Sequence, residues 1–271
     1  ILAVQIGNSI SKGLGIPGFL FEAKRQSVLY FDFELSDKQF ENRYSINYDQ
    51  HYRFHDNFIR VELDSDFIIP EHQSFEDYLN PSLEQSIIET GAKILIIDNI
   101  TYLKTETEKA KDALPLMKHL KALKNKYGLS ILALAHTPKR DLTKPITRND
   151  LQGSKMLINF CDSAFAIGES YADKNLRYIK QIKSRNTEVI YDAENVCVCQ
   201  IDKPSNFLQF EFLEFGTERS HLKQPTEEDK EALSQKIIEL NEKGKSLREI
   251  GNELGITHMK VSRILKKCNI L

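Results

Sequence analysis

The chain has 271 residues, 41% of them hydrophobic and 28% charged, and its net charge of −2 excludes a polycation, so contacts with nucleic acid would come from local basic patches. It contains no apolar run long enough to span a bilayer and no signal-peptide pattern, so we expect a cytoplasmic protein that makes no contact with a membrane. The cysteines lack the paired CxxC spacing of a zinc site, and Cys197 and Cys199 are expected to pack on one strand face.

The first part of the chain alternates short apolar runs with helical segments, which predicts a parallel α/β sheet. A mostly buried helix is expected over 1–13, ended by Gly13. Strands are expected at 27–34, 57–63, 93–99, 130–136 and 163–168. Three helices are expected between them: one starting at Ser36 with Gln39 completing a capping box, one with Pro81 early and Gly91 late, and one from about Glu108 to Tyr127.

Beyond residue 175 the pattern changes to strand-like runs separated by short polar turns. They lie at 176–186, 187–192, 195–202 and 207–215. This pattern predicts antiparallel strands that extend an edge of the sheet. The predicted organisation is an α/β domain over 1–215, a polar linker over 216–225 and a compact helical domain over 226–271.

Polar side chains end three of the predicted strands. Asp98 follows four apolar residues, and a carboxylate at a strand tip can hold magnesium directly or through water, although many buried strands end in Asp. Glu34 can orient or deprotonate an attacking water, or be a solvated residue beside a helix start. His136, followed by Thr137, can sense a γ-phosphate, or be a satisfied histidine at a strand end. Three such tips together favour a nucleotide site.

With these strand ends, residues 1–215 resemble the RecA-like ATPase core, in the branch of the RepA-type plasmid replicative helicases. KILIIDN is similar to the Walker B strand, YFDFE to the strand ending in the catalytic glutamate, and LALAHTPK to the sensor strand. The resemblance implies a three-layer core with a mostly parallel sheet and antiparallel edge strands. It implies ATP and Mg²⁺ as cofactors, with catalytic roles for Glu34, Asp98 and His136, magnesium bound through water at Asp98, and nucleotide contacts from Asp98, Asn99 and Thr137.

Residues 137–154 look like the mobile loop with which RecA-like proteins touch single-stranded DNA. The loop has little apolar content, and its cations are Lys139, Arg140, Lys144 and Arg148. An ordinary solvated loop is an equal alternative.

The segment IKQIKSRN resembles the strand that carries trans-acting cations in ring helicases. There Lys183 and Arg185 would reach the γ-phosphate bound by a neighbouring subunit, which implies catalytic roles for both. A solvated edge strand is the alternative reading. The resemblance therefore implies a homo-oligomer, a ring or filament with ATP between its subunits.

The phosphate-binding motif G-x-x-x-x-G-K-[ST] does not occur in the 271 residues. In RecA-like proteins this loop ends in Lys-Ser/Thr and passes directly into a helix like the one expected at 1–13. We therefore expect Ser or Thr before Ile1, preceded by Lys, a glycine-rich loop and the central first strand of the sheet. Nucleotide binding and hydrolysis by the 271 residues depend on that segment.

The segment KSLREIGNELGITHMKVSRIL resembles the resolvase-type helix-turn-helix, with Gly255 at the turn. A shared core is expected from Leu247, Ile250, Leu254, Ile256, Val261 and Leu265. Five Lys/Arg oppose two Glu between 247 and 271, a net of +3 that favours DNA. The last helix would enter the major groove of double-stranded DNA through Thr257, His258, Lys260, Ser262 and Arg263. A helical protein-interaction module is the alternative.

These features together predict an ATP-dependent motor or loader that acts on DNA, in the context of a plasmid or mobile element. The alternative is a DNA-binding regulator or assembly scaffold, in which ATP is a switch or is absent. The carboxylates and cations of the first domain favour the motor, whereas the separate DNA reader and the absent phosphate loop favour the alternative.

Overall fold

The computed structural model describes residues 1–62, 75–100, 113–137, 139–150, 155–268 and 270. By its internal contacts the chain divides into two compact units, Ile1–Leu222 and Lys223–Leu271. The first unit is mixed α/β and the second contains helices alone among its described residues. No described helix is both long enough and apolar enough to cross a membrane.

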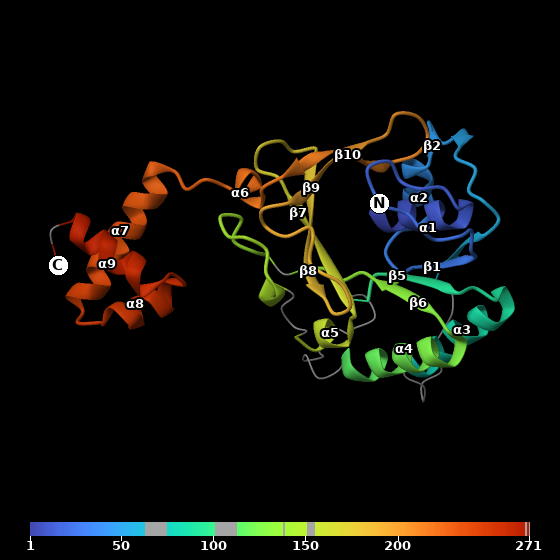
Figure 1. The fold of residues 1–271 in the computed structure, drawn as a ribbon, viewed down its shortest axis with the longest axis horizontal. Helices are drawn as coiled ribbons and strands as arrows, with labels where there is room; N and C mark the ends of the chain where they lie inside the picture. Colours follow the sequence, from blue (N-terminus) through green and yellow to red (C-terminus); the bar gives the residue numbers. More distant parts are fainter. Residues whose placement is uncertain (63–74, 101–112, 138, 151–154, 269, 271) are drawn as a thin grey trace. The chain divides into compact units, whose positions relative to one another are not determined.

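A four-stranded parallel sheet is one of two four-stranded sheets in the first unit and lies between helices (Figure 1). Its strands are β1 (Val28–Asp32), β4 (Phe58–Glu62), β5 (Ile94–Asp98) and β6 (Ser130–Ala133), and their spatial order is β4-β1-β5-β6. In the pairing of β1 with β5, Asp32 lies beside Asp98. The predicted α/β class with a parallel sheet is confirmed.

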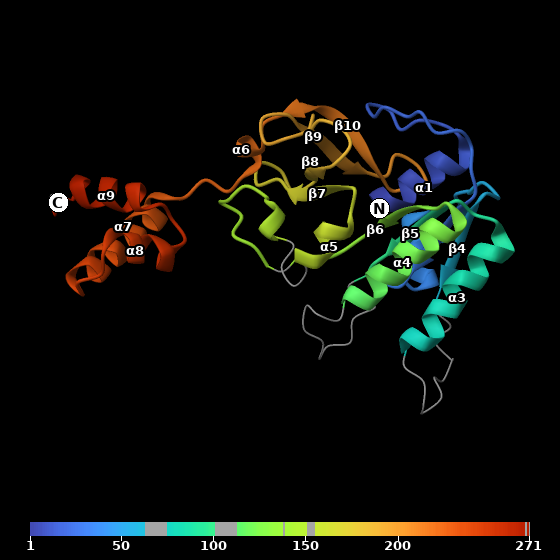
Figure 2. The same cartoon turned by 60° about the horizontal axis from the view of Figure 1, so that its bottom comes forward.

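Helices cover both faces of this sheet. On one face lie α3 (Phe75–Thr90) and α4 (Ala113–Tyr127), which Figure 2 shows side by side. Leu83 of α3 and Leu120 of α4 pack there against Leu29 and Leu95. On the other face lies α1 (Leu2–Lys12), and the alternation of side chains along a strand turns Tyr30 and Ile96 toward it.

The nearly all-round burial of α1 follows from its place between two sheets. Leu2 packs with Cys197 and Phe210 of the antiparallel sheet, while other α1 residues pack on the parallel one. The Gln5 side chain donates to the Phe210 carbonyl at 3.0 Å and accepts from the Phe210 amide at 2.9 Å. The helix ends, as predicted, at Gly13, whose φ of 68° lies in the left-handed region that glycine adopts without steric cost.

The remaining strands form a separate antiparallel sheet, ordered β10-β9-β8-β7. They are β7 (Ser163–Glu169), β8 (Leu176–Ser184), β9 (Val196–Asp202) and β10 (Gln209–Gly216). The expectation that these strands extend the parallel sheet was wrong for the described residues, because β7 pairs with β8. Residues 187–192 form no strand; the Gln181 side chain instead accepts from the amides of Ile190 and Tyr191.

Shorter elements complete the first unit. They are α2 (Asp37–Arg43), β2 (Ser45–Ile46), β3 (Gln50–His51), the 3₁₀ turn η1 (Arg148–Asp150), α5 (Lys155–Phe160) and α6 (Glu218–His221). The capping box of Ser36 and Gln39 is confirmed. Pro81 lies inside α3 rather than in its first turn, because the helix begins six residues earlier at Phe75. The predicted start near Glu108 lies outside the described residues. Part of the expected linker, including buried Glu218, belongs to the first unit.

The second unit consists of α7 (Glu227–Glu242), α8 (Leu247–Leu254) and α9 (His258–Lys267). Each helix begins after a side-chain cap, in turn Thr226, Ser246 and Thr257. Gly255 ends α8 with a φ of 62°, which allows the short turn to α9. All six residues of the predicted core lie in one apolar cluster with Ile237 and Leu240.

Candidate functional site

The carboxyl ends of β1, β5 and β6 bring three of the predicted residues together. Glu34 Oε2 accepts a hydrogen bond from Asn99 Nδ2 at 2.9 Å and lies 3.3 Å from His136 Nε2. Because the strands are parallel and Asp32 aligns with Asp98, their carboxyl ends meet at one edge of the sheet. The Glu34 side chain is 47% exposed, so its carboxylate is accessible to a water molecule or a bound phosphate.

Asp98 ends β5 at the same edge. Its Oδ2 accepts a hydrogen bond from the Tyr30 hydroxyl at 2.5 Å. Burial raises the pKa of Asp98, the Tyr30 hydrogen bond opposes that rise, and the carboxylates of Asp32 and Glu34 add to it. A cation would relieve this surplus of negative charge, and carboxylate oxygens are the donors that Mg²⁺ takes.

The start of α1 lies beside these carboxylates. Ala3 and Val4 of α1 lie in one apolar cluster with Tyr30 of β1 and Ile96 of β5, the strands that lead to these carboxylates. A helix N-terminus attracts phosphate groups through its unpaired amides and its dipole. The described residues contain no group of three His, Cys, Asp or Glu side chains suited to enclosing a metal. Mg²⁺ is usually held by one or two carboxylates together with waters and phosphate oxygens, and Asp98 is a carboxylate of this kind at the strand tip.

Sequence reasoning missed three residues around this cluster: Tyr30, Asp32 and Arg60. Tyr30 and Asp32 are two residues apart on β1, so their side chains lie on the same face of the sheet, the face that α1 covers. Asp98 lies on this face too. That alternation is a signal that could have identified them. Arg60 lies beside Tyr30 in the pairing of β4 with β1, but a pairing of distant strands has no local signal.

The structure does not bring every predicted site residue to Glu34. Thr137 is exposed beyond β6. Buried Lys183 donates from Nζ to the Ile158 carbonyl of α5. Arg185 donates to the Asn159 carbonyl at 2.6 Å. Both cations therefore contact the end of α5 in their own chain, Lys183 from β8 and Arg185 from the residue that follows β8.

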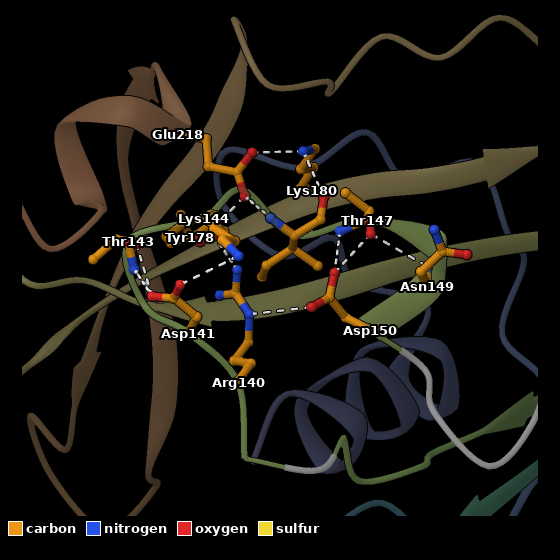
Figure 3. A network of polar contacts seen from close by, with 11 residues as sticks. Arg140, Asp141, Thr143, Lys144, Thr147, Asn149, Asp150, Tyr178, Lys180 and Glu218 are labelled. Carbon is orange, nitrogen blue, oxygen red and sulfur yellow. Dashed lines mark hydrogen bonds and ion pairs between the residues drawn. The ribbon is translucent and has the colours of Figure 1, made fainter. Parts of the chain in front are cut away.

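Described residues 139–150 of the predicted DNA loop are tied together by polar contacts, many of them drawn in Figure 3. Arg140 Nε lies 3.6 Å from Asp150 Oδ1, and Lys144 Nζ lies 3.6 Å from Asp141 Oδ2. Arg148 donates to the Ile182 carbonyl at 2.8 Å, while Lys139 is exposed. The loop is thus organised by its own ion pairs; residue 138 and residues 151–154 lie outside the description.

Helix α9 presents an exposed cationic surface. Thr257, His258, Lys260 and Arg263 are exposed and Ser262 is half-buried. Thr257 also accepts the Lys260 amide as the helix cap, at 3.3 Å. The helix contains no acidic residue, so its positive charges have no neutralising partner within it.

Residues 1–141 match a family model described as "AAA domain". The match covers just over half of the chain and includes Glu34, Asp98 and His136. No curated protein matches the chain significantly. The site geometry agrees with the family match, since strand-tip carboxylates beside a helix N-terminus suit a nucleotide with its magnesium ion. The chain belongs to the AAA domain family, whose domain is of the P-loop ATPase type.

Proposed function

We propose that this protein is an ATP-dependent motor or loader that acts on DNA, similar to the RepA-type helicases of plasmids and mobile elements. The observation that supports it most is the meeting of Glu34, Asn99 and His136 beside Asp98 and the start of α1. ATP hydrolysis requires a general base, a carboxylate suited to magnesium, a polar sensor and a helix end that attracts phosphate, and this site offers a residue for each.

In this mechanism Glu34 acts as the general base. Asn99 and His136 hold its Oε2, and the half-exposed carboxylate takes a proton from the attacking water. Asp98, through water, would hold Mg²⁺, which supplies neutralisation of phosphate charge when bound. His136 contacts Glu34 and is followed by the 139–150 loop, so it lies between the hydrolysis site and the proposed DNA contact.

The DNA contacts of the proposal lie in both units. Helices α8 and α9, with Gly255 between them, would act as a helix-turn-helix whose second helix reads duplex DNA. The 139–150 loop would contact single-stranded DNA, with Lys139 exposed for that purpose. In a homo-oligomeric ring or filament, Arg185 is the better candidate for a trans-acting cation, since its side chain is 50% exposed and that of Lys183 is buried.

A DNA-binding regulator or scaffold is the second candidate. It is favoured by the ion pairs that occupy Arg140 and Lys144 in the loop, which weaken the case for a strand-translocating surface. The exposed cations of α9 are equally compatible with this candidate.

A steady-state ATPase assay of the full-length protein, with and without single-stranded DNA, separates the two candidates. We expect turnover that single-stranded DNA stimulates. Glu34→Gln should lower kcat by roughly 10²- to 10⁴-fold while ATP binding persists, since a general base contributes about that factor. Glu188→Gln, at an exposed position, is the matched control. Absence of turnover in the full-length wild type would overturn the motor and leave the regulator.

A further inference from the structure

Arg60 of β4 contacts several parts of the segment that follows β1. Its side chain is only 15% exposed and its guanidinium lies 4.1 Å from the centre of the Phe40 ring. It donates from Nε to Asp32 Oδ2 at 3.0 Å, from Nη2 to the Leu35 carbonyl at 3.0 Å and from Nη1 to Asp37 Oδ1 at 2.8 Å. Only a planar, multidentate cation serves so many acceptors at once.

Asp32 extends these contacts to the backbone of Glu34. Its side chain is fully buried, so its charge requires the guanidinium beside it. While Oδ2 accepts from Arg60, Oδ1 accepts the amides of Glu34 at 3.2 Å and Leu35 at 2.9 Å. The orientation of Asp32 therefore determines where the backbone of Glu34 lies.

The sheet itself holds the chain only as far as Phe33, whose amide donates to the Asp98 carbonyl at 2.7 Å. At the other end, Ser36 caps α2. Between these points, the Glu34 and Leu35 amides donate to Asp32, and the Leu35 carbonyl accepts from Arg60. The Glu34 carboxylate reaches Asn99 and His136 only if this short turn keeps its path.

We propose that Arg60 is a positioning residue for Glu34, and that it acts through the buried carboxylate of Asp32 and the Leu35 carbonyl. This inference rests on the proposed function of Glu34 as general base. Arg60 touches no reacting group; it holds the base at the tips of β5 and β6. Correct placement matters because a displacement of about 1 Å at a catalytic group can cost roughly 10²-fold in rate.

The direct test is hydrogen exchange of the Glu34 and Leu35 amides in full-length wild type, Arg60→Gln and Arg53→Gln. Arg53 is an exposed arginine of the same segment, so its variant loses the same charge without these contacts. We expect exchange of both amides to quicken roughly fivefold or more in Arg60→Gln, the equivalent of one hydrogen bond. The amides of Ile96 and Ile97 in β5 should be unaffected. Unchanged exchange at Glu34 and Leu35, or equal acceleration at all four amides, would overturn the proposal.

Kinetics supply the second readout. Arg60→Gln should lower kcat roughly 10- to 100-fold with little change in KM for ATP. Arg60→Lys, which keeps the charge but not the planar fork, should recover part of the loss. If Arg60→Gln does not fold, Asp32→Asn serves instead, because its amide turns a donor toward either Arg60 or the Glu34 amide. A wild type without turnover contradicts the proposed function alone, since the exchange result still decides the role of Arg60.

Discussion

The carboxylate of Glu218 and the ammonium group of Lys180 lie 2.5 Å apart, both buried within the first unit (Figure 3). The other Glu218 oxygen accepts the Ile146 amide at 2.6 Å, and Lys180 also donates to the Ile146 carbonyl at 2.8 Å. Tyr178 adds a longer hydrogen bond to Glu218, at 3.3 Å. Glu218 belongs to α6, Lys180 to β8 and Ile146 to the 139–150 loop. Because both members of the pair also bond to Ile146, the pair holds the loop against β8.

Breaking this pair on one side should destabilise the first unit. Glu218→Ala leaves the Lys180 charge buried without a partner, which costs about 3–5 kcal/mol of unfolding free energy. The double variant Glu218→Gln with Lys180→Met removes both charges and should recover most of that loss. Hydrogen exchange at the amides of Tyr178 and Ile179, with chemical denaturation, measures the effect.

Glu214→Ala, at an exposed position of β10, is the control for the Glu218 variant and should stay within about 0.5 kcal/mol of wild type. A Glu218→Ala protein as stable as this control would contradict the assigned role of the pair. A double variant no more stable than Glu218→Ala would show that the pair does more than neutralise its own charges.

Local patterns were enough to predict much of the fold. The capping boxes at Ser36 and Ser246 and the left-handed glycines Gly13 and Gly255 fix helix ends through contacts within a few residues. Apolar runs ending in a polar residue identified β1 and β5, and parallel pairing then required their ends to meet. That logic brought Glu34 close to Asn99 and His136, as the structure shows.

The contacts that hold the site were not predictable in the same way. Arg60 and Asp32 are 28 residues apart in the sequence, and Lys180 and Glu218 are 38 residues apart. No periodic pattern in the sequence predicts either pair. The sequence likewise did not show that Lys183 would be buried against a carbonyl of α5. The pairing of β7 with β8, rather than with a strand of the parallel sheet, likewise depends on tertiary contacts.

Neutralising Asp98 should stabilise the protein while it removes function. Because the pKa of Asp98 in the folded protein is raised above its ordinary 3.8, mainly by burial, the ionised form favours unfolding. Asp98→Asn, whose side-chain oxygen can still accept from Tyr30, should therefore have a higher unfolding free energy than wild type at pH 7. The difference should shrink as the pH falls through the raised pKa toward 4, where wild-type Asp98 takes up its proton.

Denaturation of Asp98→Asn and wild type across this pH range measures the difference, with exposed Asp56→Asn as the control. Magnesium-dependent ATP turnover should be lost in Asp98→Asn and kept in Asp56→Asn. A variant less stable than wild type at neutral pH would show that the carboxylate makes a favourable contact outweighing its burial.

The exposed cations of α9 should contribute to DNA affinity through phosphate contacts. Lys260→Ala and Arg263→Ala should each weaken binding to duplex DNA and reduce the slope of log affinity against log salt by about 1, the signature of one lost phosphate contact. Lys236→Ala, an exposed lysine of α7, should leave the slope unchanged. Fluorescence anisotropy at several salt concentrations provides the measurement, and equal slopes for all variants would remove α9 from the interface.

Gly251 is required by the close turn between α8 and α9. It is buried, and a Cβ built there would lie 2.7 Å from the Ile256 carbonyl oxygen and 3.2 Å from the His258 amide. Both obstacles are backbone atoms, so a methyl group would force the two helices apart. Gly251→Ala should therefore destabilise the second unit by about 1–3 kcal/mol, the usual cost of overpacking, although alanine is the better helix former.

Hydrogen exchange of the Val261 and Leu265 amides in the full chain reports on this loss, since both residues lie in the core of the second unit. Asn252→Ala is the matched control, because Asn252 is exposed on the same helix. In Gly251→Ala, both the affinity for duplex DNA and the protection of these amides from hydrogen exchange should fall. The protection of the β8 amides should stay unchanged. Preserved protection at Val261 would mean that α8 and α9 accommodate the methyl group, and that the close approach at Ile256 does not set their packing.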